Sequence, residues 1–399
     1  MKIGIVSDWH LGYLWGDPKL EMDSFNQLSE AFSILEEENV DLVLAPGDLF
    51  DRKIPTPEVF YEAIHLFNHI KIENKINLKF NNELLKIPMI GILGNHEYVG
   101  KDYKSTLELM EVMGFSKFMH ASSITINQDN EKVSVFGLSG IPDKYAIDVL
   151  KTWNPTPVPG SYNILMVHQS FKEYLPFEDE EILSLSNLPS GFDLIINGHL
   201  HWKQEVKLPQ GGIFVMPGST IATQNKKLES DTPKGIYLLD TKTKELRFIE
   251  LKNTRPIIYI DLVFKKSSPK DIEDKINQEL EKIKERDLKK APFIRIRIKG
   301  DLESGFFSKD IDLKKFELIY PNYYISFANN IEEKALKESV DKLRELEKNR
   351  GNLEEMSKKI FFEQLSQTKI STDFDSKRIF DLLYNGDLDK AKKLILESK

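Results

Sequence analysis

Five short segments of the chain carry side chains that bind metal ions or move protons. They contain five of the eight histidines in the sequence. Each segment by itself is more often a loop-capping residue or a satisfied surface histidine than a ligand. The five together form a far more specific pattern, and they predict a metal-dependent site. The segments are Asp8-Trp9-His10, Gly47-Asp48-Leu49-Phe50-Asp51, Gly94-Asn95-His96-Glu97, His168 alone, and Gly198-His199-Leu200-His201.

The residue types and their spacing favour a site for two ions. Residues i and i+2 of an extended segment point the same way, so Asp8 and His10 can bind one cation. The same argument lets His199 and His201 face one cleft. Carboxylate, amide and imidazole donors suit Mn²⁺, Fe or Zn²⁺ better than Ca²⁺. Seven such ligands exceed the need of one ion with an open position, and they suit two ions about 3.5 to 4 Å apart that share Asp48. The seven are Asp8, His10, Asp48, Asn95, His168, His199 and His201.

These segments follow the strands of a predicted layered α/β domain. The aliphatic runs IGIVSD, VDLVLAPGD and PMIGILGN alternate with helix-like stretches at residues 23–38 and 56–70. Aliphatic runs that stop at polar residues and alternate with helices are typical of buried strands in such a domain. The ends of those strands are therefore the expected place of the site. Further strands are expected at residues 133–138, 162–168, 193–197, 213–216 and 235–240.

The pattern changes after residue 252. IIYIDLVF and FIRIRIK alternate in polarity around a charged helix at residues 270–287, which predicts a smaller α+β domain. From Ile331 onward strand signals vanish, and apolar residues recur at helical spacing. We expect two or three amphipathic helices there, which either fold onto one another or dock onto a partner. The predicted domains are residues 1–252, 253–330 and 331–399. The apolar residues of the last are Leu336, Val340, Leu343, Met356, Ile360, Leu365, Ile379, Leu382 and Leu383.

Composition limits the class of protein. A length of 399 residues with 40% apolar and 30% charged residues predicts two or three folded units. No apolar run reaches the roughly 18 residues of a membrane helix, so we expect a soluble cytoplasmic protein. The absence of cysteine excludes thiolate ligands. A net charge of -8 argues against binding nucleic acid by bulk electrostatics, although residues 251–320 hold 17 basic against 13 acidic residues.

The ordered segments resemble the signature of the calcineurin-like metallophosphoesterase superfamily. SDWHLG with the following tyrosine, GDLFDRKIPTP, GNHE, VHQS, LPSGFD before INGHLH, and VMPGST look like the nuclease subunit of the double-strand-break repair complex. That subunit is called SbcD in bacteria and has archaeal and eukaryotic relatives named for meiotic recombination. The match spans residues 1 to about 220. The resemblance implies a layered α-β-β-α sandwich with a smaller α+β capping domain that contacts DNA and a C-terminal helical tail.

The resemblance also implies a role for each site residue. His96 would contact the scissile phosphate and assist departure of the leaving group. A water activated by metal would attack the phosphorus in line. Asp51 and Glu97 would orient ligands or cap their loops from outside the ligand set. Asp8, His10, Asp48 and His201 would hold the first ion, and Asp48, Asn95, His168 and His199 the second.

The expected activity is that of a Mn²⁺-dependent DNA nuclease, with 3′-to-5′ double-strand exonuclease and single-strand endonuclease activity on DNA ends. Two Mn²⁺ ions are expected, with Fe or Zn as alternatives. An SMC-like ABC-type ATPase, called SbcC in bacteria, would bind the tail helices within 353–397. No membrane is involved, and a nucleoid-associated, prokaryotic cytoplasmic location is implied. A homodimer would form through helices at 56–70 and 103–113, although half of the suitable apolar residues could equally belong to the core. These are Val59, Phe60, Ile64, Phe67, Leu107 and Met110.

Two other functions stay open at this point. The metal motifs alone also fit a phosphatase or phosphodiesterase for small molecules or phosphoproteins, but such an enzyme has no obvious need of a basic second domain and a tail. A DNA-tethering scaffold with a vestigial nuclease site is opposed by the completeness of the ligand set. His65 and His69 share one helix face without a visible third ligand. Trp9 and Tyr13 could stack on a displaced base, although ordinary packing is the commoner role.

Overall fold

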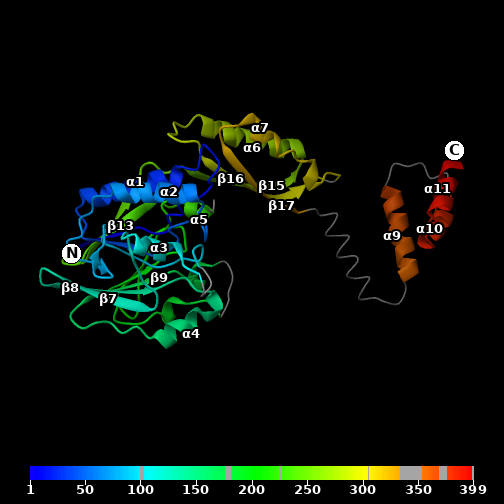
Figure 1. Ribbon diagram of the computed structural model, residues 1–399. Helices are drawn as coiled ribbons and strands as arrows, with labels where there is room; N and C mark the ends of the chain where they lie inside the picture. Colours follow the sequence, from blue (N-terminus) through cyan, green and yellow to red (C-terminus); the bar gives the residue numbers. More distant parts are fainter. Residues whose placement is uncertain are drawn as a thin grey trace. The chain divides into compact units, whose positions relative to one another are not determined.

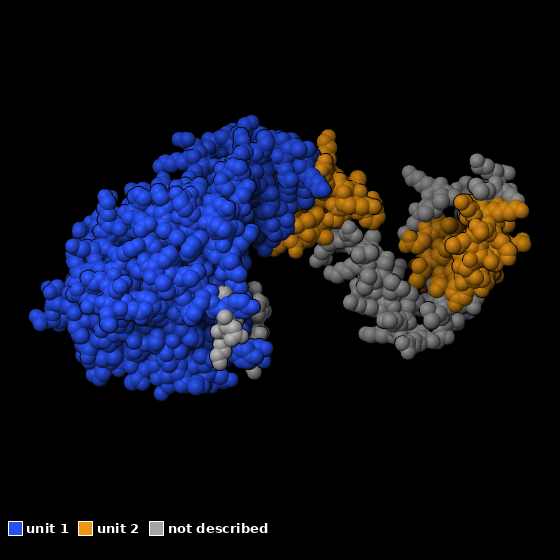
Figure 2. Space-filling model, viewed as in Figure 1, with its two compact units in different colours: residues 1–262, 278–297, 313–328 blue, residues 263–277, 298–312, 329–399 orange. Residues whose placement is uncertain are grey.

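The computed structural model describes residues 1–98, 103–175, 181–223, 226–303, 305–332, 353–367 and 375–397 (Figure 1). The chain divides into two compact units (Figure 2). The first comprises residues 1–262, 278–297 and 313–328, and the second comprises residues 263–277, 298–312 and 329–399. The three-domain division predicted from the sequence stays a prediction.

The first unit contains two six-stranded sheets. One has the order β14-β13-β1-β2-β5-β6, in which β1, β2, β5 and β6 run parallel while β13 pairs antiparallel with both β1 and β14. Its strands are β1 (Lys2–Ile5), β2 (Leu42–Ala45), β5 (Met89–Gly91), β6 (Lys117–Phe118), β13 (Gly235–Asp240) and β14 (Glu245–Glu250).

The second sheet has the order β11-β12-β10-β9-β8-β7, with four parallel strands between antiparallel edges. The five later strands expected from the sequence are confirmed, four of them here and one as β13. The strands are β7 (Ser122–Gln128), β8 (Glu131–Leu138), β9 (Tyr162–Val167), β10 (Leu194–Asn197), β11 (Gln204–Lys207) and β12 (Ile213–Met216).

Apolar side chains fill three layers, because successive residues of a strand point to opposite faces. In β2, Leu42 and Leu44 face the core between the two sheets, whereas Val43 faces the outer helices. Those helices are α1 (Asp23–Glu37), α2 (Pro57–His69) and α3 (Thr106–Val112). On the far side, α4 (Asp143–Trp153) covers the second sheet (Figure 1). The predicted α-β-β-α sandwich is confirmed.

Local sequence explains where the outer helices begin. The Thr56 hydroxyl accepts a hydrogen bond from Val59 N (3.4 Å), and Pro57 occupies the first helical position of α2. Ser105 and Glu108 form a capping box at the start of α3. In α1, Phe25, Leu28 and Phe32 recur at the spacing of one buried face.

A smaller three-stranded sheet has the order β15-β16-β17. Its strands are β15 (Ile257–Ser267), β16 (Phe293–Leu302) and β17 (Tyr324–Glu332), and the chain also forms α6 (Pro269–Lys284) and α7 (Lys315–Ile319) here. Ile272, Ile276 and Leu280 recur every fourth residue of α6 and are buried. The α+β segment predicted after residue 252 is confirmed.

The C-terminal part has three described helices: α9 (Leu353–Gln367), α10 (Ser376–Tyr384) and α11 (Leu388–Glu397). The rings of Phe361 and Phe380 lie 5.4 Å apart, and Ile379 is buried, so α9 and α10 pack on one another. The predicted helical tail is confirmed for this part. Of the apolar residues named for it, Leu336, Val340 and Leu343, together with the Met356 side chain, lie outside the described residues. Across the described ranges, no helix has the length and apolar character needed to cross a membrane.

Candidate metal centre

The predicted site residues follow strands of both sheets, at the ends where the parallel strands finish. Asp8 follows β1, Asp48 follows β2, Asn95 follows β5, His168 follows β9 and His199 follows β10. In open α/β sheets the carboxyl ends of the strands form the usual binding crevice. Asp8, Asp48 and His199 have positive φ angles of 50°, 50° and 75°. Such backbone strain clusters at functional sites.

Buried contacts hold these loops in place. The Glu97 carboxylate accepts hydrogen bonds from Phe50 N (3.0 Å) and Gly94 N (3.1 Å), and so ties the loop after β2 to the loop after β5. Burial and the neighbouring Asp48 charge raise the pKa of Glu97 to about 7. Trp9 is fully buried, with its indole N–H donating to Val6 O (2.8 Å). Trp9 therefore packs in the interior and cannot stack on a base.

A first group of donors comes from both sheets. The ligand atoms of Asp8, His10, Asp48 and His201 all lie within 4.8 Å of one another, and all four residues are buried. His10 Nε2 lies 3.2 Å from His201 Nε2 and 3.9 Å from Asp48 Oδ2. His201 Nε2 lies 3.8 Å from Asp8 Oδ1.

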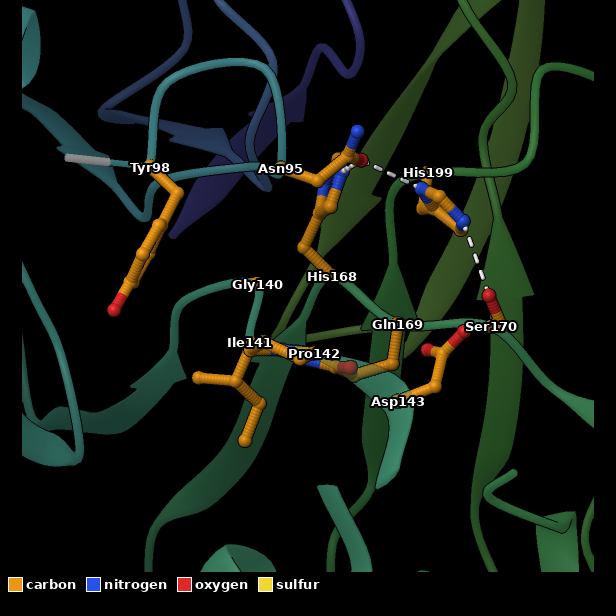
Figure 3. Close-up of a pocket in the computed structure, with 10 residues that line it drawn as sticks. All are labelled: Asn95, Tyr98, Gly140, Ile141, Pro142, Asp143, His168, Gln169, Ser170 and His199. Atoms are coloured by element: carbon orange, nitrogen blue, oxygen red, sulfur yellow. Dashed lines mark hydrogen bonds between the residues drawn. The ribbon is translucent and has the colours of Figure 1, made fainter. Parts of the chain in front are cut away.

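A second group adjoins the first through Asp48. Asp48 Oδ2 lies 3.2 Å from His168 Nε2, which is also 3.2 Å from Asn95 Oδ1. Asn95 Oδ1 lies 2.8 Å from His199 Nδ1. Asn95, His168 and His199 converge at one end of a pocket (Figure 3). Asp48 therefore belongs to both groups, as the sequence predicts for a shared carboxylate.

Outer hydrogen bonds fix which nitrogen of each imidazole faces the groups. His168 Nδ1 bonds to Pro46 O (2.8 Å), and His199 Nε2 bonds to Ser170 Oγ (3.1 Å). His201 Nδ1 bonds to Thr223 Oγ1. The opposite nitrogen of each ring is left to face the other donors. Engaging the outer nitrogen in this way is the usual arrangement for histidines that bind metals.

A glycine is required beside His168. A Cβ at Gly198 would lie 2.2 Å from Pro46 O and 2.5 Å from His168 Nδ1. It would therefore break the hydrogen bond that orients the imidazole. The glycines of the GDLFD, GNHE and GHLH segments flank the predicted ligands, and at Gly198 the reason is this close approach.

Burial shapes the electrostatics of the two groups. It raises the pKa of Asp8. Burial also opposes ionisation of Asp48, but the charge of His168 lowers the pKa of that carboxyl. Burial disfavours charged His168, yet Asp48 raises the pKa of His168 to about 9. Burial lowers the pKa of His199 to about 3 and that of His201 well below its usual value. A cation bound between these groups would replace the proton on His168 as the positive charge that balances the buried carboxylates.

The donor set fits divalent metal ions. Two imidazole nitrogens, on His10 and His201, face one another at 3.2 Å inside the protein. His10 Nδ1 is buried and lies 3.4 Å from Asp51 Oδ1. Oxygen and imidazole donors without thiolate match Mn²⁺, Fe or Zn²⁺.

His96 lies at the edge of the site and is 39% exposed. Its Nδ1 bonds to Asp51 O (2.8 Å), and its backbone N–H donates to Asp48 Oδ1 (3.0 Å). The Asp51 carboxylate lies 3.4 Å from His10 Nδ1. The structure thus brings all ten predicted site residues together, with Glu97 turned into the loops and Asp51 beside two histidines.

A pocket of about 280 Å³ opens beside the second group (Figure 3). Sequence reasoning missed most of its walls. Gln169 and Ser170 belong to the VHQS segment, whose motif could have indicated them as site residues. The loop at residues 140–143 has no sequence feature that predicts its place in the pocket. The pocket is lined by Asn95, Tyr98, Gly140, Ile141, Pro142, Asp143, His168, Gln169, Ser170 and His199.

Other predicted residues have other places. The His65 and His69 rings lie 4.5 Å apart, and neither belongs to a group of three metal-binding side chains among the described residues.

Part of the apolar set suggested for a dimer contact belongs to the core instead. In that set, Val59, Phe67, Leu107 and Met110 are buried within the monomer. The expectation that half of the set could be core is confirmed for these four.

The fold and the paired donor groups define a metal-dependent phosphoesterase. The family model described as calcineurin-like phosphoesterase matches residues 1–203. The chain therefore belongs to the calcineurin-like phosphoesterase family, as its motifs predict. A phosphoesterase is a hydrolase, so the predicted reaction class is confirmed at that level.

Relatives named for DNA repair match a larger part of the chain. Double-strand break repair protein MRE11 of Encephalitozoon cuniculi is 27% identical over 341 residues, which are 79% of this chain and 57% of that protein. DNA double-strand break repair protein Mre11 of Sulfolobus acidocaldarius is 26% identical, over 83% of each chain. MRE11 of Arabidopsis thaliana is 27% identical, over 75% of this chain and 50% of its own length. The chain thus spans 57% of the Encephalitozoon protein and half of the Arabidopsis protein.

Proposed function

We propose that this protein is a two-metal DNA nuclease that processes ends in double-strand-break repair. The observation that carries the proposal is the pair of donor groups that share Asp48 at the ends of strands from both sheets. The family match supports phosphoester hydrolysis. The names of the relatives support DNA breaks as the biological substrate.

Each group would hold one ion. We assign Asp8, His10, Asp48 and His201 to the first ion and Asp48, Asn95, His168 and His199 to the second. Two divalent ions there would supply Lewis acidity for the phosphate and lower the pKa of an attacking water. The chain itself fixes its donors by burial and by outer hydrogen bonds, so little reorganisation is needed when the ions bind.

His96 is placed to act on the leaving group. The bond from Nδ1–H to Asp51 O holds the ring, and the imidazolium form, with a second proton on Nε2, would donate that proton or a hydrogen bond to an oxygen of the substrate. The backbone bond from His96 to Asp48 couples its position to the shared carboxylate. Asp51 and Glu97 support these loops and do not join the ligand set.

The pocket beside the second group would receive part of the DNA strand. Its walls combine the Tyr98 ring and the apolar Ile141 and Pro142 with the polar Gln169 and Ser170. An aromatic and apolar wall suits a nucleobase, because stacking tolerates any base.

The finer features follow the same proposal. Mn²⁺ is the expected ion, with Fe or Zn²⁺ as alternatives, and the expected activities are 3′-to-5′ exonuclease on duplexes and endonuclease on single strands. Residues 253–330 would contact DNA. Residues 331–399 would bind an SMC-like ABC-type ATPase through their helices, on which Leu383, Tyr384, Leu388 and Ile395 are exposed. A homodimer and a nucleoid-associated, prokaryotic cytoplasmic location complete the proposal.

The test of the activity uses purified full-length protein on end-labelled linear duplex DNA with and without Mn²⁺. We expect Mn²⁺-dependent shortening of the labelled strand. Hydrolysis of p-nitrophenyl phosphate without digestion of DNA would favour a small-molecule phosphatase. Binding of DNA without hydrolysis of either substrate would favour a tethering scaffold.

The test of the partner uses a chain truncated after residue 332. We expect the truncated protein to lose co-purification with the ATPase and to keep its Mn²⁺-dependent nuclease activity. Retained co-purification would remove the assignment of the tail.

A further inference from the structure

His201 is held by a closed ring of hydrogen bonds whose other members do not belong to the predicted ligand set. Its Nδ1 bonds to Thr223 Oγ1, and its backbone carbonyl accepts from Lys234 Nζ (2.8 Å). Lys234 Nζ also bonds to Glu229 Oε1 (2.6 Å), which accepts from Thr223 N (3.0 Å). The ring therefore returns to the residue that bonds the imidazole.

The ion pair of the ring is buried, whereas Thr223 is half-buried. Lys234 is 7% exposed and Glu229 only 1%. An ion pair so far from water is costly unless every donor and acceptor is satisfied. Here Lys234 Nζ makes a third hydrogen bond, to Ser219 Oγ (2.7 Å). A buried pair with this many directed bonds fixes the geometry of its neighbours.

The loop that carries Thr223 is also held from the side of the first ligands. The Tyr13 hydroxyl donates to Thr223 O (2.9 Å). Gly218 brings the same loop close to His201, since a Cβ there would lie 3.0 Å from His201 O. Thr223 is thus fixed through its N–H, its carbonyl and its hydroxyl. None of Thr223, Glu229 and Lys234 lies within the matched residues 1–203.

We propose that Thr223 is a positioning residue for the first ion, with the Lys234–Glu229 pair holding it in place. The Thr223 hydroxyl accepts from His201 Nδ1–H, so that the lone pair of Nε2 faces Asp8 and His10. Without the hydroxyl, the ring can carry its hydrogen on Nε2 and turn that donor toward the cation. The inference rests on the proposed two-metal site and adds a support that the ligand motifs do not reveal.

The test counts bound ions by calorimetric titration of the metal-free full chain with Mn²⁺ alone. Wild-type protein should show two binding events. Thr223→Val should weaken one event roughly 10- to 100-fold and leave the other unchanged, as loss of an outer hydrogen bond to a ligand does. Thr223→Ser, which keeps the hydroxyl, should restore both events. Lys234→Met should reproduce the valine result.

Lys117→Met is the matched control. Lys117 forms an ion pair with Glu111 at the same 2.6 Å distance in the same unit, and neither residue belongs to a donor group. This variant should keep both binding events. Thermal unfolding of each metal-free variant confirms that it is folded. Should Lys234→Met not fold, the comparison of valine with serine at position 223 decides.

Three results would overturn the inference while leaving the two-metal site intact. Thr223→Val could bind both ions as tightly as wild type does. Thr223→Ser could be as weak as Thr223→Val, so that the hydroxyl has no role. Both events could weaken equally, which would indicate general damage to the fold. Wild-type protein that takes up no Mn²⁺ would instead contradict the two-metal site, and this inference with it.

Discussion

Asp48 is the side chain that joins the two donor groups. One of its oxygens approaches His168 at 3.2 Å, and the other accepts from His96 N at 3.0 Å. The residue sits on a left-handed backbone that few residues other than glycine adopt readily. Its position is therefore set by the whole surrounding loop.

Replacing the shared carboxylate tests whether both ions depend on it. In wild-type protein, Mn²⁺ at 100 times its dissociation constant should stabilise the fold by about 2.7 kcal/mol per site. Asp48→Asn should abolish that rise in melting temperature and lower nuclease activity more than about 100-fold. Differential scanning calorimetry with and without Mn²⁺ measures the first effect. A full Mn²⁺-dependent rise in the variant would show that Asp48 is not shared.

His96 tests the chemistry separately from ion binding. Because its ring bonds to the Asp51 carbonyl and His96 is not one of the assigned ligands, His96→Ala should leave both Mn²⁺ binding events in place. Removing a general acid should lower the rate of DNA digestion by about 10² to 10⁴-fold. Initial rates on end-labelled duplex, with calorimetry as control, decide this point. Unchanged digestion would remove the assigned role.

The residues of the site were predictable because their types and order are specific. Asp8, His10 and Asp48 follow aliphatic runs that predict buried strands. Packing alone gives no reason to place polar residues there. Thr223 and Lys234 were not predictable, because a threonine and a lysine have many ordinary roles. Only the folded chain brings Lys234 to the carbonyl of His201.

The elements that support the site are the strands and the outer helices. Trp9 lies between two aromatic rings of the outer layer, with centroids 5.9 Å from Phe32 on α1 and 6.0 Å from Phe67 on α2. This contact anchors the loop that carries the first ligands. The central strands could be predicted from their aliphatic runs, whereas the pocket loop at 140–143 could not, since loops have no periodic pattern.

Shortening the Phe32 side chain, which packs on Trp9, should lower the stability of the protein. Phe32→Ala should destabilise the protein by about 3 to 5 kcal/mol, because it removes a buried ring and leaves a cavity. Ser33→Ala, on the exposed side of the same helix, should change stability by less than about 0.5 kcal/mol. Urea denaturation of both metal-free variants makes the comparison. Equal stability of the two would contradict the packing of Trp9 on α1.

At the scale of the whole molecule, the sequence predicted the succession of sandwich, α+β segment and helical tail from changes in periodicity. The sequence could not show which apolar residues of a helix are exposed. Helical periodicity identifies an apolar face but does not show what packs against that face. The structure shows Tyr61 on α2 and Leu109 and Val112 on α3 exposed, at 65%, 47% and 71%. These residues replace the buried ones as candidates for a contact between two copies.

Val112→Asp tests that contact. A carboxylate there should convert a dimer to a monomer, because burying an unpaired charge in an interface is costly. Sedimentation velocity of wild type and variant measures the change. The matched substitution Val263→Asp, at a position on β15 that is also exposed (69%), should leave the dimer intact. A wild-type protein that sediments as a monomer would contradict the proposed homodimer.

The central claim is that two ions share Asp48 between donor groups drawn from distant stretches of the chain. The most direct measurement is a crystal structure of the protein soaked in Mn²⁺, with anomalous diffraction to locate the ions. We predict two anomalous peaks about 3.5 to 4 Å apart, with the Asp48 carboxylate bound to both. An empty centre in saturating Mn²⁺, or one ion that does not contact Asp48, would contradict the account.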